Sequence, residues 1–215
     1  MRLPSISAFA SILPAVPSGT ELTALLVVVC FSAGLNVYAT VAMLGVLSHA
    51  KVLALPPALH LVDSWYVIAI CGVLFLVEFV GDKIPIFDLL WNAMHTFVRV
   101  PVAGLLTYGA TAQLPQWERL LATLVGSLIA LAAHSGKTAA RAAVAHSPEP
   151  FSNIALSLGE DALVVFLMWF ATRHAYAAAG IAAVGLVAIA ITIRVVVRAM
   201  RNLFGETEGA LAARG

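Results

Sequence analysis

The chain has 215 residues, of which 61% are hydrophobic and only 11% are charged, and its mean hydropathy is +0.98. That composition leaves too little polar surface to cover a water-facing globule, so a soluble globular protein is excluded. The formal net charge is +1 with histidine neutral, and no basic patch or acidic tail is present, so we expect no nucleic-acid partner.

Long uncharged runs predict helices that cross a lipid bilayer. Residues 22–50 and 174–193 contain no Asp, Glu, Lys or Arg, and a span needs about 20 apolar residues. Reading the apolar runs between breakers predicts an all-α integral membrane protein with about six transmembrane or re-entrant helices. The predicted helices cover 22–47, 64–80, 89–112, 119–144, 153–172 and 175–203.

The ends of the chain are expected to lie outside the membrane domain. Prolines interrupt the only apolar stretch of residues 1–20, so we interpret this segment as an interfacial tail and not as a signal peptide. Ser18 and Glu21 match a capping box, which predicts a helix start near residue 20. A single membrane domain is expected over 21–203, followed by a cytoplasmic tail over 204–215.

The third predicted helix contains Arg99 followed by Pro101. Proline breaks or kinks a helix near the residue before it, so a re-entrant segment over 82–112 is an alternative to a span. Broken backbone at membrane depth is tolerated only where protein or a water-filled cavity surrounds it. A break at this point would therefore indicate a permeation pathway.

Basic residues are distributed unevenly between the two predicted sides. Six spans would place both termini on one side, and Arg and Lys accumulate on cytoplasmic sides, so both termini are predicted to be cytoplasmic in a bacterial inner membrane. That side would hold Arg2, Lys83, Lys137, Arg141, Arg194, Arg198, Arg201 and Arg214, against Lys51, Arg119 and Arg173 on the other.

Residues 22–112 and 119–203 share a layout in which a long helix with polar residues precedes a proline-bearing connection and a short acidic helix. Three spans in each half would give the halves opposite orientations. This parity predicts a 3+3 inverted repeat, an arrangement that places binding sites near the membrane midplane of secondary transporters.

Polar residues on one face of an apolar helix are the main candidates for a site. Asp88, Asn92, His95 and Arg99 share a helical stripe, as do His134, Lys137, Thr138 and Arg141. A buried charge is costly in a bilayer, so the first stripe should face a cavity or other polar helices. The second stripe is interpreted as an anion-facing wall. The alternatives are an interfacial helix with a snorkelling arginine and an ordinary cytoplasmic helix end.

We predict substrate-binding residues for an anion because Arg grips carboxylate or phosphate bidentately and Lys adds a point charge. The set is Arg99, His95, Asn92, Asp88, Lys137, Arg141 and Asn36. Four carboxylates within apolar segments supply the opposite sign, either as fixed ion pairs or as a proton relay. These are Glu78, Asp82, Glu160 and Asp161.

Several kinds of chemistry find no support in the sequence. No HxxxH or HExxH spacing predicts a metal site, and no GxSxG predicts a catalytic serine. Gly136-Lys137-Thr138 lacks the earlier glycine and the preceding strand of a P-loop. Cys30 and Cys71 lie in apolar runs and are interpreted as small core residues. We therefore expect no catalytic residues, no metal and no cofactor.

The same residues resemble a bacterial family of multi-span membrane proteins catalogued as domain of unknown function 4126. The resemblance covers about residues 22–204 and implies a shared membrane fold, but no activity or substrate. It is carried by GLNVY at 34–38, EFVGDKIP at 78–85, SPEPFSN at 147–153, and Trp91, His95, Thr96, Phe97, Arg99, Pro101, Lys137, Arg141, Glu160 and Asp161.

These observations favour a small secondary transporter or permeation protein for an anionic solute or lipid headgroup, in contact with the bilayer and able to form a homo-oligomer. One alternative is a non-catalytic membrane scaffold, in which the charges only pair and small residues pack the helices. Another is an intramembrane lipid-modifying enzyme that uses His95 with Glu78 or Asp88 as acid and base.

Overall fold

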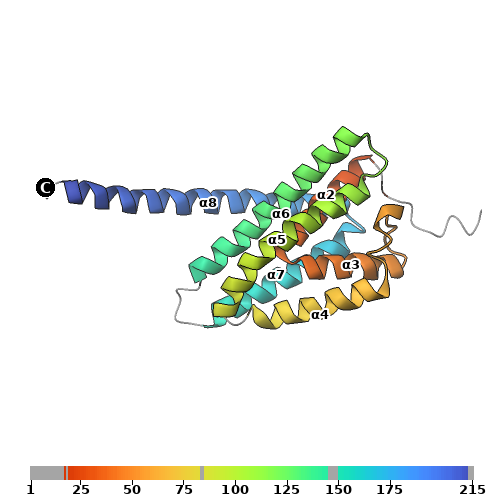
Figure 1. Cartoon of the computed structure of the whole chain (residues 1–215), viewed down its shortest axis with the longest axis horizontal. Coiled ribbons are helices and arrows are strands. Elements are labelled where there is room, and N and C mark those ends of the chain that lie inside the picture. The colour runs from red at the N-terminus through yellow and green to blue at the C-terminus, as the bar shows by residue number, and fades with distance from the viewer. Residues whose placement is uncertain (1–16, 18, 83–84, 145–149, 213–215) are drawn as a thin grey trace, which may run out of the picture.

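The computed structural model describes residues 17, 19–82, 85–144 and 150–212, and these contain α-helices and one short 3₁₀ helix but no strand. Figure 1 shows the helices as a bundle from which the last helix projects. In chain order they are α2 (Gly19–Leu35), α3 (Val37–His49), η1 (Pro57–Leu59), α4 (Trp65–Gly81), α5 (Pro85–Ala110), α6 (Gln116–Val144), α7 (Pro150–Ala171) and α8 (Ala175–Ala212).

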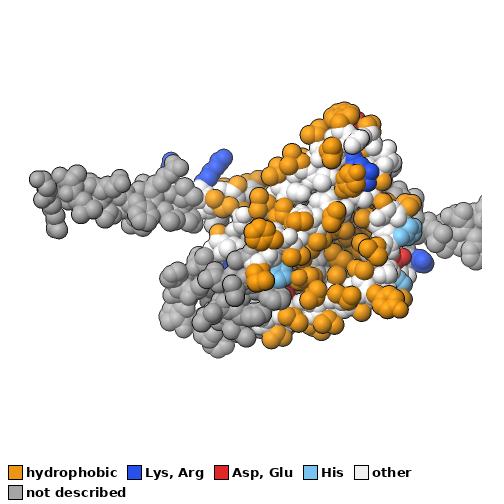
Figure 2. All heavy atoms as spheres, viewed as in Figure 1, with side chains coloured by type: hydrophobic (Ala, Val, Ile, Leu, Met, Phe, Trp, Pro, Cys, Tyr) orange, Lys and Arg blue, Asp and Glu red, His pale blue; other side chains and the backbone are white. Residues whose placement is uncertain are grey.

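The outer surface is apolar, as in a helical membrane protein. Within α6, α7 and α8, the segments 116–141, 154–171 and 175–195 are long and apolar enough to cross a bilayer. Large hydrophobic side chains point outward, Phe97 being 83% exposed and Val184 70%, and they cover much of the face in Figure 2. Soluble monomers rarely expose apolar patches of this extent. The prediction of an all-helical chain with several apolar spans is confirmed at this level.

The first predicted helix, 22–47, is wrong as a single span, because it divides at Asn36 into α2 and α3. Asn36 has extended backbone angles (φ −149°, ψ 102°), and its side-chain Oδ1 accepts a 2.9 Å hydrogen bond from the backbone N–H of Ala39. Asparagine competes in this way with helix continuation and is among the preferred helix N-caps. Apolar composition conceals this break, since both sides of it remain hydrophobic.

After the break the chain returns to the end of the bundle from which it came (Figure 1). In His49, which closes α3, Nδ1 lies 2.7 Å from Oδ1 of Asp63 just before α4. At the start of α2, Thr20 Oγ1 lies 2.8 Å from the Tyr176 hydroxyl at the start of α8. We call α2–α3 the broken hairpin and this end of the molecule the hairpin end; α5 and α7 begin at the opposite, distal end.

The described residues do not form six continuous spans, because the broken hairpin, in place of the first predicted helix, enters and leaves at the same end. Helices α4 to α8 then run alternately between the two ends. Thr20 consequently lies at the hairpin end. Arg194 and Arg198 lie farther along α8, which starts at the hairpin end and runs toward the distal end. The predicted placement of both termini on one side is therefore not supported for the described residues, which do not include 1–16.

The expected break at Pro101 is absent. Helix α5 continues through this proline from Pro85 to Ala110, so the backbone break lies at Asn36 and not within the described part of this segment. Helix α8 also continues beyond the predicted end at 203, to Ala212. Ser18, the proposed N-cap, lies outside the described residues, and α2 begins at Gly19.

Small residues bring α2 and α6 close together. A Cβ built on Gly34 would lie 2.4 Å from the backbone oxygen of Ala130 and 2.7 Å from Cβ of Ala133. Small residues at helix interfaces allow this approach in membranes, where packing and not hydrophobic burial drives association. We call Gly34, Ala130 and Ala133 the small-residue seam; it holds the end of α2 against the polar stripe of α6.

Candidate functional site

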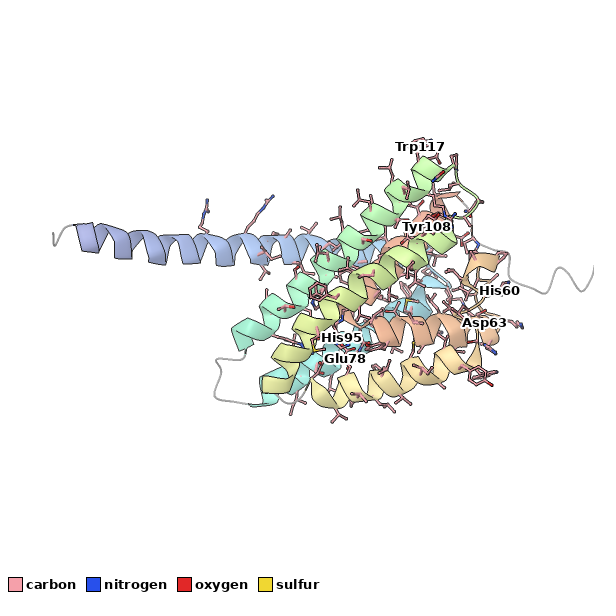
Figure 3. All side chains as sticks on the ribbon, viewed as in Figure 1. His60, Asp63, Glu78, His95, Tyr108 and Trp117 are labelled. Carbon is pink, nitrogen blue, oxygen red and sulfur yellow. The ribbon has the colours of Figure 1, made fainter. Side chains whose placement is uncertain are left out.

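Seven charged side chains from four helical segments are buried together in the bundle, and Figure 3 labels Glu78 among them, near His95 and away from the residues labelled at the hairpin end. Each is at most 9% exposed. We call them the buried charge cluster: Glu78 and Asp82 of α4 and its C-cap, Arg99 of α5, Lys137 and Arg141 of α6, and Glu160 and Asp161 of α7.

Arg99 lies at one side of this cluster and is fully buried. Its Nη2 forms an ion pair with Glu78 Oε1. Its Nη1 lies 2.8 Å from His134 Nδ1 and 3.4 Å from the carbonyl oxygen of Gly34. The interpretation of Arg99 as a snorkelling interfacial residue therefore does not fit, since snorkelling keeps the charged group in water.

The contact with Arg99 determines the protonation of His134. A guanidinium group has only donors, so Nδ1 of His134 must accept and the imidazole proton must reside on Nε2. Nε2 lies 2.7 Å from Thr96 Oγ1, which can accept that hydrogen bond. His134 is thus a neutral residue that orients Arg99, and protonation at Nδ1 would break this contact.

Lys137 is surrounded by oxygen atoms. Its Nζ lies 3.2 Å from Glu78 Oε1, 3.2 Å from Asp82 Oδ2 and 3.5 Å from Glu160 Oε2. It also donates to the backbone carbonyl of Leu35 at 3.1 Å. A single lysine therefore joins α4, α6 and α7 to the end of α2, which compensates for the cost of burying its charge.

Arg141 completes the polar face of α6. Its Nη2 lies 2.7 Å from both Asp82 Oδ2 and Glu160 Oε2, and its Nη1 donates to the Asp82 carbonyl at 3.2 Å. Burial and pairing of Lys137 and Arg141 exclude the alternative in which this stripe is a solvated cytoplasmic helix end.

The tip of the broken hairpin lies against the cluster. The last carbonyls of a helix have no partner within it, and here those of Gly34 and Leu35 accept from Arg99 and Lys137. These cations also complement the negative end of the helix dipole of α2. Asn36 Nδ2 donates a 2.9 Å hydrogen bond to Asp161 Oδ1. The cluster thus supports the backbone break.

The other predicted stripe is only partly described. His95 is 5% exposed, and its Nε2 lies 2.8 Å from the hydroxyl of Tyr38 on α3. The side chains of Asp88 and Asn92 lie outside the described residues, although both positions belong to α5. Oε1 of Glu78, the acid considered as a partner of His95, forms ion pairs with Arg99 and Lys137.

A pocket of about 390 Å³ opens at the hairpin end between α2, α5 and α6. Its walls run from Thr20 to Cys30 on α2 and from Thr111 to Thr107 on α5. Cys30 is one helical turn from Gly34, so the pocket ends just before the small-residue seam. Its volume falls within the range of about 300–1,000 Å³ that is usual for ligand pockets.

The family model described as domain of unknown function (DUF4126) matches residues 23–195 of this chain. The chain belongs to this family. The matched region of the DUF4126 chain contains the whole buried charge cluster and the tip of the broken hairpin. No curated protein and no solved structure matches the chain.

Some participants in this DUF4126 site were not predicted from the sequence. His134 was placed on the correct stripe but not among the site residues, and neither Tyr38 nor the carbonyls of Gly34 and Leu35 were considered. His134 lies three residues before Lys137 on the same helical face, and this spacing could have indicated His134 as a site residue. Backbone acceptors carry no sequence signal, because any residue supplies a carbonyl. Among the described residues, no group of three His, Cys, Asp or Glu side chains could hold a metal ion.

Proposed function

We propose that this protein is a small secondary transporter or permeation protein for an anionic solute or lipid headgroup. The observation that supports it best is the meeting of a helix break with the buried cations Arg99 and Lys137, which lie in one cluster with Arg141. Broken helices that meet buried charges form the binding sites of many secondary transporters, and buried ionisable groups in membrane helices mark substrate or ion pathways.

The arrangement suggests how an anion would be accommodated. Each of the three cations is held by carboxylates and, except for Arg141, by carbonyls of the α2 end. An incoming carboxylate or phosphate would replace one carboxylate partner, so that no cation is left unpaired in a medium of low polarity. The pocket at the hairpin end provides an approach as far as the small-residue seam, which would have to open.

We propose that the distal end faces the bacterial cytoplasm. Arg194 follows the start of α8 by 19 residues, which is about 29 Å of helix, close to the thickness of about 30 Å of the hydrocarbon core. Arg194 and Arg198 are exposed at this point, and exposed basic residues accumulate on the cytoplasmic side. The hairpin end, with Lys51, would then face outward.

The inverted repeat stays a prediction with weaker support. Its parity depended on three spans in residues 22–112, but the broken hairpin returns to its starting end, so α2 and α6 begin at the same end. Superposition of residues 22–112 on 119–203 after inversion remains the test of this relation.

Reconstitution into liposomes tests the proposed function. Uptake of inorganic phosphate, sulfate and acetate would be measured beside scrambling of a fluorescent phosphatidylglycerol, which separates a free anion from a lipid headgroup. We expect anion-dependent flux in the wild type and its loss in Arg141→Gln. Arg173→Ala, which changes an exposed arginine at the hairpin end, should behave as the wild type. Absence of flux for every substrate would contradict transport.

A scaffold is the second candidate, because every cation of the cluster already has carboxylate partners. In that case the cluster only fixes helix positions. A scaffold predicts a co-purifying partner and no flux, and it predicts that charge-neutral replacement of a whole ion pair leaves function intact. A lipid-modifying enzyme would instead be recognised by chemically altered lipid in the same liposomes.

A further inference from the structure

We infer that Asp161 is the proton-exchanging carboxylate of the buried charge cluster, and that its protonation changes the charge at the tip of the broken hairpin. As the coupling step of a transporter this inference depends on the proposed function, but the protonation itself does not. Sequence analysis did not distinguish between the four carboxylates, and the inference identifies one of them as the group that binds the proton.

Asp161 differs from the other three carboxylates in its partners. Glu78, Asp82 and Glu160 each form an ion pair with two of the cluster's cations. Asp161 forms no ion pair among the described residues; its Oδ1 accepts from the neutral amide of Asn36. An ionised carboxylate with only a neutral partner is the costliest one to keep in an apolar interior.

The balance of charges in the cluster leads to the same residue. Four carboxylates meet three cations, and His134 is neutral because it accepts from Arg99. Among the described residues, one carboxylate of the cluster therefore lacks a matching cation. The three others are paired, so the surplus negative charge falls on Asp161, and one proton there brings the buried charge cluster to neutrality.

The second oxygen of Asp161 is available to carry that proton. Asp161 is only 5% exposed, yet Oδ2 has no hydrogen-bond partner among the described residues. Asn36 cannot turn its oxygen toward this carboxyl group, because Asn36 Oδ1 is fixed by the N–H of Ala39. Its amide therefore donates to Oδ1 whether Oδ2 is bare or protonated, so the hairpin tip stays attached in both states.

Several charged groups surround Asp161 and would respond to its protonation. Lys137 of α6 and the carboxylates Glu78 and Asp82 at the end of α4 act on it electrostatically, and Glu160 precedes it on α7. From α2 and α3 the facing polar group is the Asn36 amide. No charged side chain of α8 contacts Asp161 among the described residues. Loss of the negative charge would weaken the electrostatic attraction on Lys137, the cation that also binds the carbonyl of Leu35.

The step is a simple proton transfer. A hydronium ion arriving from the aqueous side gives its proton to Oδ2, where an O–H bond forms and the carboxylate becomes a neutral carboxylic acid, leaving water. The reverse transfer restores the carboxylate. In the proposed transporter, neutral Asp161 would accompany an anion bound to Lys137 or Arg141, so that an anion and a proton would move together.

Infrared difference spectroscopy of the full chain in lipid tests protonation without any substrate. The carbonyl stretch of a buried protonated carboxyl group should appear and disappear as pH is varied. We expect Asp161→Asn to lose this band. Glu21→Gln, which removes an exposed carboxylate at the hairpin end, should retain it. If Asp161→Asn does not fold, Asp161→Glu should keep a titrating band at a shifted frequency.

The possible results separate the two proposals. The assignment would be overturned if the wild type showed no titrating band. It would also be overturned if the band were unchanged in both Asp161 variants. A band that depends on Asp161 in a protein without solute flux would support proton exchange while contradicting transport. Flux that alkalinises the anion's side of origin in the wild type but not in Asp161→Asn would support coupling between anion and proton.

Discussion

At the scale of single residues, each charged side chain of the buried charge cluster depends on its oppositely charged or polar partners. A charge within the bilayer interior is tolerated only with partners, and removing one partner leaves the other uncompensated. Arg99 illustrates this, because it touches an acid of α4, a histidine of α6 and a carbonyl of α2. Its loss should therefore affect three helices together.

Arg99→Ala is expected to destabilise the protein by about 3–5 kcal/mol, the range for breaking a buried ion pair. Arg99→Lys should recover part of this loss, because it keeps the charge for Glu78 but cannot also reach His134 with a planar fork. Thermal unfolding in detergent measures both, with Arg173→Ala as an exposed control. Melting temperatures equal to that of the wild type would show that the pair contributes nothing.

A double-mutant cycle tests whether Glu78 and Lys137 act as a pair. Glu78→Gln and Lys137→Met should each destabilise the fold, since each leaves an opposite charge without one partner. The double variant should lose less than the sum, with a coupling free energy of about 0.5–3 kcal/mol for contacting residues. Strict additivity of the unfolding free energies would refute direct coupling.

At the scale of elements, the broken hairpin depends on close packing with α6. Its tip can be held by Arg99 and Lys137 only while α2 approaches α6 at Gly34, where a Cβ would collide with backbone. The seam thus positions the carbonyls of Gly34 and Leu35 that the cations bind. Packing and electrostatics depend on each other at this point.

Gly34→Ala is therefore expected to destabilise the protein by about 1–3 kcal/mol, as overpacking usually does. Gly72→Ala is the matched control, because no atom lies within 4 Å of a Cβ built there. It should be neutral or stabilising by up to about 1 kcal/mol through helix propensity. Equal melting temperatures for the two variants would contradict a tight seam.

At the scale of the whole molecule, the broken hairpin determines on which side the described N-terminal residues lie. Because the chain returns after Asn36, Thr20 shares an end with Tyr176, whereas α8 carries its exposed arginines toward the other end. An uninterrupted first span would give the opposite arrangement.

Cysteine labelling in a Cys30→Ala, Cys71→Ala background checks this arrangement. Cysteines at Thr20 and Lys51 should react with an impermeant maleimide from outside the cell, and one at Arg198 only after permeabilisation. Labelling of Thr20→Cys and Arg198→Cys from the same side would mean that the chain crosses the membrane an even number of times between them. That result would contradict the arrangement described here. A reporter fused after residue 205 should give a cytoplasmic signal.

By itself, the sequence determined the membrane class, most helix locations and the identity of the residues that form the cluster. These follow from local properties: apolar length, capping chemistry, and the rarity of charge in hydrophobic helices. Only the tertiary structure decided where the backbone breaks, because Asn36 interrupts a helix without changing hydropathy, whereas Pro101 is accommodated within α5. It also decided which charges meet, since pairing depends on which helices are neighbours and not on spacing within one helix. The particular position of Asp161, opposite a neutral amide, follows from that arrangement in space.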